Sequence, residues 1–260
     1  MLFEPFISLV WWSFLSEYAI QTGIGKYWTS KKGCRCALIA GPKGNKYMRI
    51  AIMGGTFNPI HFGHLRIAEE VREAFSLDKA LFMPTFQPPH KDNGSLISPE
   101  HRLEMVRLAI KDNPFFEASD IEIKRGGRSY SVVTLKALHE MHPDIEIHFI
   151  VGTDSFNDIT TWCEYEELFR LTNFIVIPRP GYAVKKIGEV LPVELARKFW
   201  YDSEKAVYAN AYGRFVSYME TTLYSISASR IRKMIKEELS TRYLLPVEVE
   251  GYIRKNRLYR

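Results

Sequence analysis

The sequence predicts an α/β fold with a doubly wound, mainly parallel sheet and helices on both of its faces. Short continuous apolar runs, such as "RIAIM" at 49–53 and "IEIHFIV" at 145–151, are typical of strands that are buried on both faces. Segments with helical periodicity separate these runs along the chain. Because crossovers between parallel strands are right-handed, this alternation indicates a Rossmann-like sheet covered on both sides.

The first strand is expected over 49–55, where "RIAIMGG" ends in two glycines. The next helix covers 64–75, because Leu65, Ala68, Val71 and Phe75 share one helical face. The following elements alternate in the same way. They are a strand over 79–84, a polar loop over 85–97, a helix over 98–112, an extended segment over 115–123, a helix over 131–142, a strand over 145–152, a helix over 164–171 and a strand over 173–178.

The last third of the chain is harder to predict. We expect a helix near 192–200, an extended segment near 214–222 and two final helices over 228–239 and 247–256. In a doubly wound sheet, ligands bind beyond the carboxyl ends of the strands. The segments "GGTFNPIH", "PTFQPPHK", "GTDS" and "IPRPG" should therefore lie along one edge of the sheet.

Composition limits the classes of partner. The chain has 260 residues, is 46% apolar and carries a formal charge of +5. Residues 1–47 hold six basic and two acidic residues, so most of that charge lies outside the alternating region and no basic stripe for nucleic acid is expected. Cys34, Cys36 and Cys163 form no disulfide framework, which favours a cytoplasmic location. The sequence leaves open whether the chain forms a homo-oligomer.

Residues 1–47 are predicted to be an N-terminal extension outside the fold, with the domain over 48–260. The apolar run at 6–15 is too short to span a bilayer, and a membrane role is not expected. An interfacial anchor remains the alternative for this run.

The segment "GGTFNPIHFGHL" at 54–65 carries the main functional signal. Gly54 and Gly55 would permit a positive φ and the close approach of another molecule. The start of the following helix offers unpaired N–H groups to a phosphate. His61 and His64 should face the same way, with Gly63 leaving space beside them. Two imidazoles in this position can donate hydrogen bonds to a phosphoryl group that gains charge in a transition state. A two-histidine metal site is the alternative, although no acidic third ligand lies nearby.

This segment resembles the signature of the nucleotidyltransferase superfamily, in which a glycine-rich turn leads into a His-x-Gly-His helix. Further segments, "PTFQPPHK", "RSYSVVTL", "GTDSFNDITTW", "RPG" and "ISASRIR", occur in the order typical of bacterial nicotinate mononucleotide adenylyltransferases. The resemblance extends from Met48 to Tyr259. One departure is Asn58, where the family commonly has Asp.

The resemblance implies which residues bind ATP and which catalyse the reaction. A carboxylate at Asp154, after a strand, can also accept hydrogen bonds from ribose hydroxyls, and Ser227 and Arg232 at a helix start can hold a triphosphate. The catalytic residues are expected to be His61, His64 and Arg232. The ATP-binding residues are expected to be Gly54, Gly55, Thr56, Phe57, His61, His64, Gly152, Asp154, Ser227 and Arg232.

The acceptor side follows chiefly from the resemblance. An aromatic face can stack on a pyridinium ring, and a lysine can meet a phosphate; the aromatic residues could instead belong to the core. The expected acceptor-binding residues are Thr85, Lys91, Tyr130, Ser131 and Trp162.

The implied activity is adenylyl transfer from ATP to nicotinate mononucleotide, giving deamido-NAD and pyrophosphate. Mg²⁺ is expected to arrive with ATP, with no protein metal site. Two alternatives stay open. One is a sister enzyme that uses nicotinamide mononucleotide or phosphopantetheine. The other is a nucleotide-binding sensor without catalytic activity.

Overall fold

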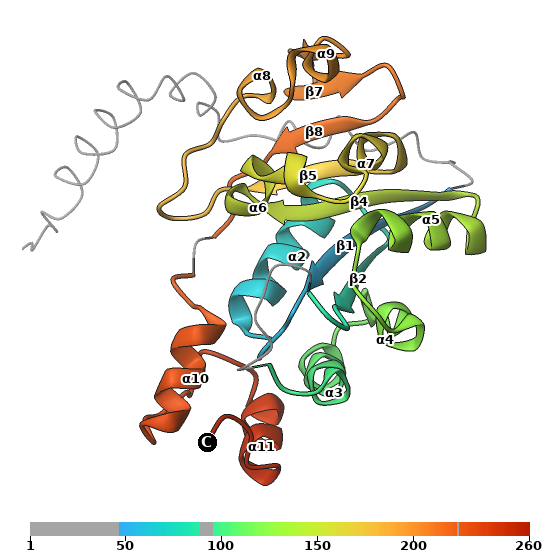
Figure 1. The fold of residues 1–260 in the computed structure, drawn as a ribbon. Coiled ribbons are helices and arrows are strands. Elements are labelled where there is room, and N and C mark those ends of the chain that lie inside the picture. Colours follow the sequence, from blue (N-terminus) through green and yellow to red (C-terminus); the bar gives the residue numbers. More distant parts are fainter. Residues whose placement is uncertain (1–46, 89–95, 223) are drawn as a thin grey trace, which may run out of the picture. The chain divides into compact units, whose positions relative to one another are not determined.

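The computed structural model describes residues 47–88, 96–222 and 224–260 of the chain. Within these residues, eight strands form one sheet in the order β3-β2-β1-β4-β5-β8-β7-β6 (Figure 1). Neighbouring strands are parallel from β3 to β8, whereas β7 is antiparallel to both β8 and β6. The predicted doubly wound, mainly parallel fold is confirmed. The strands are β1 (Met48–Gly55), β2 (Lys79–Pro84), β3 (Phe116–Ala118), β4 (Ile145–Gly152), β5 (Asn173–Ile177), β6 (Phe199–Asp202), β7 (Val207–Asn210) and β8 (Phe215–Tyr218).

Each face of the sheet carries its own hydrophobic core, and the core clusters assign the main helices to the two faces. One cluster draws residues from α2 (Phe62–Ala74), α3 (Pro99–Ile110), α10 (Ala228–Lys236) and α11 (Val247–Lys255), and the other from α5 (Ser131–Met141), α6 (Thr153–Asn157), α7 (Tyr165–Leu171), α8 (Ile187–Val190) and α9 (Val193–Ala196). Ile50 and Ile52 of β1 belong to the second cluster, whereas Ala51 and Met53 belong to the first. Because successive side chains point to opposite faces, both of which are buried, the strand is apolar from Ile50 to Met53 without alternation.

The order in which the chain adds strands to the sheet reverses beside β1. The chain runs outward from β1 to β2 and β3, and then returns to place β4 on the other side of β1. Connections that diverge in this way leave a crevice between the carboxyl ends of the two strands. The crevice between β1 and β4 is therefore where the fold favours ligand binding.

Two predicted elements differ from the structure. The extended segment expected over 115–123 is a strand only at Phe116–Ala118, and the helix α4 (Ile121–Arg125) follows it. The helix expected near 192–200 is limited to α9, after which "FWYD" forms β6 and pairs with β7. Tyr201 and Tyr208 face each other across this hairpin, with ring centroids 5.2 Å apart. Aromatic residues favour such cross-strand pairs, and this tertiary contact overrides the weak helical pattern. The extended segment expected near 214–222 is confirmed by β8.

Two expectations lie outside the described residues. All of the N-terminal extension predicted over 1–47 except its last residue falls in 1–46, together with its apolar run, and Lys91 falls in 89–95. In the described part of the chain, no helix has the length and apolar character needed to cross a membrane.

A buried polar cluster lies at the opposite ends of the strands from this crevice. Arg49 and Glu146 are neighbours in the β1–β4 register, and the Arg49 Nε lies 3.2 Å from the Glu146 Oε2. The His148 Nε2 lies 3.1 Å from the other carboxylate oxygen, to which the Asn173 side-chain amide also donates at 3.2 Å. The contact with His148, followed by the charge of Arg49, lowers the pKa of Glu146 to about 2.

This cluster should make the fold sensitive to acid. Between about pH 4.5 and pH 2 the unfolded chain binds a proton at Glu146 that the folded chain does not, so the stabilisation is complete above this range and lost as the pH falls through it. We expect Glu146→Gln to lower the free energy of unfolding by about 2 kcal/mol at pH 7, and the difference from the wild type to vanish near pH 2. Urea denaturation across this range measures the effect. Glu117→Gln, which affects a half-exposed carboxylate paired with Lys79, is the control and should change stability by less than about 1 kcal/mol. A deficit for Glu146→Gln that is the same at both pH values would contradict the linkage.

Candidate active site

The turn after β1 has its positive φ at a residue that the sequence did not indicate. Gly54 and Gly55 belong to β1, and the left-handed residue is Phe57, with φ 46°. The expectation that the glycines adopt a positive φ is therefore wrong. A Cβ on Gly55 would lie 3.3 Å from the buried Phe57 ring, so this glycine makes room for the ring that packs back over the strand. A non-glycine residue with such a φ is costly, and the surrounding structure has to maintain it.

His61 and His64 are stacked at the start of α2. Their ring centroids are 3.7 Å apart and their planes differ by 26°, which confirms that the two imidazoles face the same way. His61 is the N-cap residue with extended backbone, and His64 is the third residue of the helix. The His64 Nδ1 accepts the backbone N–H of His61 at 3.3 Å. Neutral His64 therefore carries its proton on Nε2, which makes Nε2 its donor atom.

His61 is held in its uncharged form. Burial, and secondly the positive charge of Arg179, lower the pKa of His61 to about 4. Only 7% of the residue is exposed, and its Nδ1 is buried. Buried polar atoms in folded proteins almost always have a partner. For His61 the nearest group is the first turn of α2, because its side chain faces the backbone N–H of His64 in a capping box.

Gly63 provides space for the His61 ring itself. A Cβ at this position would lie 3.1 Å from the His61 Nδ1 and 3.2 Å from the Cε1. The sequence predicted that the glycine clears space beside both histidines. The structure shows that the first group to use this space is the imidazole of His61.

Asp154 and Arg179 form an ion pair beyond the carboxyl ends of β4 and β5. The Arg179 Nη1 lies 2.5 Å from the Asp154 Oδ2, and the Asp154 Oδ1 is buried with no hydrogen-bond partner in the described residues. The Arg179 backbone N–H also donates to the Thr153 hydroxyl at 2.9 Å. A side chain on Gly152 would collide with the Asp154 carboxylate, so a larger residue there would displace this carboxylate. The positive charge of Arg179 also lowers the pKa of His61, which indicates that the ion pair and the histidine pair lie near each other.

Arg232 contacts the turn that leads to the histidines. Its Nη1 donates to the carbonyl oxygen of Asn58 at 2.8 Å, although 174 residues separate the two in sequence. The Tyr259 hydroxyl donates to the Asn58 Oδ1 at 2.8 Å, and burial raises the pKa of this tyrosine well above its usual value. Arg232 is the fifth residue of α10, close to the first turn of the helix as expected. The turn after β1 is thus held by two side chains from the end of the chain.

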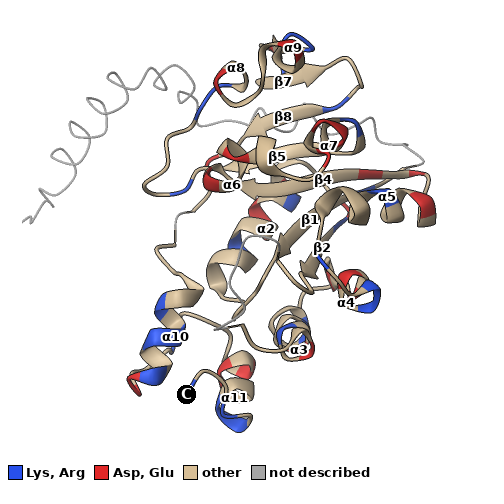
Figure 2. Cartoon of the chain, viewed as in Figure 1, with Lys and Arg blue, Asp and Glu red and all other residues tan. Residues whose placement is uncertain are grey.

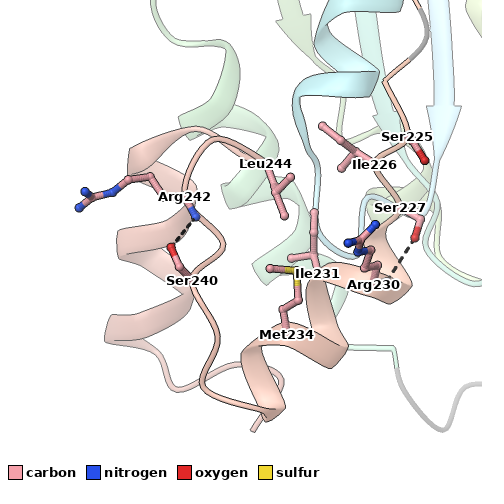
Figure 3. Close-up of a pocket in the computed structure, with 9 residues that line it drawn as sticks. All are labelled: Ser225, Ile226, Ser227, Arg230, Ile231, Met234, Ser240, Arg242 and Leu244. Atoms are coloured by element: carbon pink, nitrogen blue, oxygen red, sulfur yellow. Dashed lines mark hydrogen bonds between the residues drawn. The ribbon is translucent and has the colours of Figure 1, made fainter.

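Ser227 caps α10 beside a surface pocket of about 230 Å³ (Figure 3). Its hydroxyl accepts the backbone N–H of Arg230 at 3.2 Å. Arg230 and Arg242 also line the pocket, and the Arg242 side chain extends away from the other lining residues. Figure 2 shows the concentration of basic residues along α10. Among the predicted ATP-binding residues that the structure describes, only Ser227 lines this pocket, so it adjoins the histidine site and does not coincide with it.

The expected acceptor residues that the structure describes are Thr85, Tyr130, Ser131 and Trp162. Ser131 and Trp162 lie around one narrow space, with no room for a water molecule, together with Leu135, Phe149, Leu168 and Phe174. Tyr130 and Trp162 are half-buried against the core, so each combines a packed face with an exposed one. The Thr85 backbone N–H donates to the Gly55 carbonyl at 3.0 Å, which brings the acceptor loop against β1. The Thr85 hydroxyl oxygen is buried and has no partner in the described residues.

A protein metal site requires several ligand side chains in one place. No group of three or more His, Cys, Asp or Glu side chains in the ranges given above could hold a metal ion. The donor set at the histidines consists of two stacked imidazoles, of which His61 is uncharged and close to a positive arginine. This arrangement fits an anionic phosphate better than it fits a cation.

Sequence reasoning missed two residues at this site. Arg179 was part of a recognised segment, "RPG", but was given no role, and Tyr259 was treated only as the end of the resemblance. For Arg179, its position directly after the strand "NFIVIP" was the available signal. No local pattern indicated Tyr259, because its partner Asn58 lies 201 residues away.

The fold and the histidine site define a nucleotidyltransferase. The family model described as cytidylyltransferase-like matches residues 52–234, a range that includes His61, Asp154 and Arg232, and the chain belongs to this family. Within it, the chain is 50% identical over 212 residues to proteins of Citrifermentans bemidjiense and Geotalea daltonii, each named "Probable nicotinate-nucleotide adenylyltransferase". Each match covers 82% of this chain and 98% of the relative. These matches place the chain among the nicotinate-nucleotide adenylyltransferases.

Solved structures support the fold. The nicotinic acid mononucleotide adenylyltransferase of Plasmodium falciparum complexed with NaAD aligns with a TM-score of 0.62 at 22% identity. The same enzyme complexed with APC gives 0.61 at 22% identity, and both comparisons cover 82% of this chain and 98% of the other. At this identity the likeness shows that the two proteins share a fold.

The electrostatic account of His61 can be tested by titration. NMR of the imidazole nitrogens should give a pKa of about 4 for His61 in the protein without ligand. In Arg179→Met the pKa should rise only part of the way towards 6.5, because burial is the larger cause and remains. Arg197→Met is the control, because Arg197 is exposed and pairs with Glu194 on α9. A pKa near 6.5 in the wild type would contradict the buried, uncharged state.

Proposed function

We propose that this chain transfers the adenylyl group of ATP to nicotinate mononucleotide, releasing pyrophosphate and forming nicotinate adenine dinucleotide for NAD biosynthesis. The observation that carries this proposal is the 50% identity to nicotinate-nucleotide adenylyltransferases along 98% of their length. The histidine pair supports the chemistry, because two stacked imidazoles at a helix start can donate hydrogen bonds to phosphate oxygens.

The reaction is an in-line displacement at the α-phosphorus of ATP. A phosphate oxygen of the mononucleotide forms the new bond to phosphorus, and the bond from phosphorus to the bridging oxygen of pyrophosphate breaks. The attacking oxygen is already anionic at neutral pH, so no protein group has to remove a proton from it. The protein mainly positions two anions that repel each other and stabilises the charge on the phosphoryl oxygens.

On the donor side, we assign His61, His64 and Arg232 to the phosphates. Because the His64 Nδ1 already accepts a hydrogen bond, its Nε2 is the atom that can donate to a phosphate. Arg232 donates to the carbonyl oxygen of Asn58, in the turn that leads to the histidines. Asp154 accepts hydrogen bonds from the ribose hydroxyls at its buried Oδ1. We assign the remaining contacts with ATP to the backbone at the ends of β1 and β4 and to the N-cap of α10. These residues are Gly54, Gly55, Thr56, Phe57, Gly152 and Ser227.

On the acceptor side, the proposed residues are those expected from the sequence. The unpartnered Thr85 hydroxyl supports a contact with the mononucleotide. The exposed parts of Tyr130 and Trp162, next to Ser131, suit a flat cationic ring. Lys91 is proposed as a contact of the acceptor phosphate on the basis of the family resemblance.

Nucleotidyltransferases of this family generally use a divalent metal ion. We propose that Mg²⁺ arrives bound to ATP, because phosphate oxygens are ligands that Mg²⁺ prefers. We also propose that residues 48–260 form the catalytic domain and that the enzyme works in the cytoplasm. The matches to relatives, which cover 98% of their length with 82% of this chain, support this domain boundary.

Pyrophosphate release measured with each acceptor in turn tests the proposal. With ATP and Mg²⁺, nicotinate mononucleotide should give a higher kcat/KM than nicotinamide mononucleotide or phosphopantetheine. If the enzyme prefers either of the other two compounds, the acceptor assigned here is wrong, whereas the assignment as an adenylyltransferase stands. Binding of ATP without pyrophosphate release from any of the three would identify a sensor instead of an enzyme.

His64→Ala should lower kcat by about 100-fold or more while the melting temperature stays close to that of the wild type. The substitution removes one preorganised donor and affects a half-buried residue, so the fold should tolerate it. His142→Ala is the matched control, since His142 is exposed at the end of α5 and should keep full turnover. Unchanged turnover in His64→Ala would remove the histidine from the proposed mechanism.

A further inference from the structure

Arg102 of α3 is a fully buried arginine to which the mechanism above gives no role. Its exposed fraction is 0%, the lowest value for any charged residue in the described part of the chain. No carboxylate of the described residues lies within ion-pair distance of it. A buried guanidinium of this kind is costly unless its N–H groups are well satisfied.

The guanidinium binds three backbone carbonyls from three different segments. Its Nη1 donates to Thr56 at 2.9 Å, its Nη2 donates to Phe86 at 3.0 Å, and its Nε donates to Ile97 at 3.2 Å. Thr56 belongs to the turn after β1, Phe86 to the loop after β2, and Ile97 to the segment that enters α3. The planar fork of one arginine thus fixes the spacing between two loops at the edge of the sheet.

The first of these segments carries the donor half of the site. Thr56 precedes Phe57, the residue with φ 46°, and Arg232 binds the carbonyl of Asn58 directly after it. The left-handed residue is therefore held by a guanidinium on each side. His61 lies only three residues after Asn58. A shift of the Thr56 carbonyl, which Arg102 holds, would therefore move the histidine pair through a short stretch of backbone.

The second segment carries the acceptor half. Phe86 follows Thr85, and its backbone N–H donates to the Ser129 hydroxyl at 2.9 Å. The Ser129 backbone N–H donates in turn to the carbonyl of Gln87 at 3.0 Å. Ser129 is buried and directly precedes Tyr130 and Ser131. The carbonyl that Arg102 holds is therefore connected to three of the proposed acceptor-binding residues.

We propose that Arg102 is a positioning residue for adenylyl transfer, which sets the separation between the turn that holds the donor nucleotide and the loop that holds the acceptor nucleotide. This inference rests on the function proposed above. In-line displacement requires the attacking oxygen and the phosphorus to be aligned closely, and a misplacement of about 1 Å can cost about 100-fold in rate. Arg102 touches neither substrate, and it acts through the backbone of Thr56 and Phe86.

The test uses Arg102→Met and Arg102→Lys in the full chain, with Arg107→Met as the matched control. Methionine removes all three donors and keeps an unbranched side chain of similar length. Lysine keeps the charge but cannot reach three carbonyls in a fork. Arg107 lies on the same helix with 52% of its side chain exposed, and its ion-pair contacts are no closer than 3.9 Å.

We expect kcat to fall by about 30- to 100-fold in Arg102→Met and by a smaller factor in Arg102→Lys. The Kd of each nucleotide measured alone by calorimetry should change by less than about threefold, because each half of the site is still present. Arg107→Met should keep the wild-type kcat. A residue that only stabilises the fold would lower the melting temperature and leave kcat unchanged well below it.

Each other outcome has a defined meaning. A folded Arg102→Met enzyme with kcat within threefold of the wild type overturns the proposal. If Arg102→Met does not fold, Arg102→Lys decides by the same criterion, and failure of both to fold at 15 °C shows a structural role and overturns the proposal as well. Absence of pyrophosphate release from the wild type and from Arg107→Met would instead refute the proposed function.

Discussion

The turn between β1 and α2 depends on hydrogen bonds from two guanidinium groups to its backbone carbonyls. Phe57 adopts a left-handed conformation that costs a non-glycine residue about 1–3 kcal/mol. Arg102 binds the carbonyl before it and Arg232 binds the carbonyl after it, while Tyr259 binds the Asn58 side chain. The conformation that brings the histidines to the sheet edge is thus maintained by residues from α3, α10 and the end of the chain.

The charges at the sheet edge are arranged for anionic substrates. His61 is kept uncharged by burial and by Arg179, and the charge of Arg179 is balanced by Asp154. An uncharged imidazole donates a hydrogen bond to a phosphate without competing for a proton, whereas the arginines provide the positive charge. This separation of roles suits a reaction in which two phosphates have to approach each other.

The site also follows from the topology of the sheet. β1 and β4 are adjacent, and the chain leaves them in opposite directions, so their carboxyl ends open onto one crevice. The histidines follow β1, and Asp154 follows β4. The polar cluster of Arg49, Glu146 and His148 lies towards the other ends of the same strands, away from His61 and Asp154.

The sequence by itself determined the alternation of strands and helices, the sheet edge that carries the site and the shared direction of His61 and His64, because these depend on local periodicity and spacing. It also contained a signal for Arg102, which precedes the buried Val106 by four residues and therefore falls on the buried face of its helix. Only the tertiary structure decided that Phe57 and not a glycine takes the positive φ, that "FWYD" pairs as a strand, and that Arg179, Arg102 and Tyr259 reach the site. These features depend on contacts between residues that are distant in sequence, and no local pattern specifies such a partner.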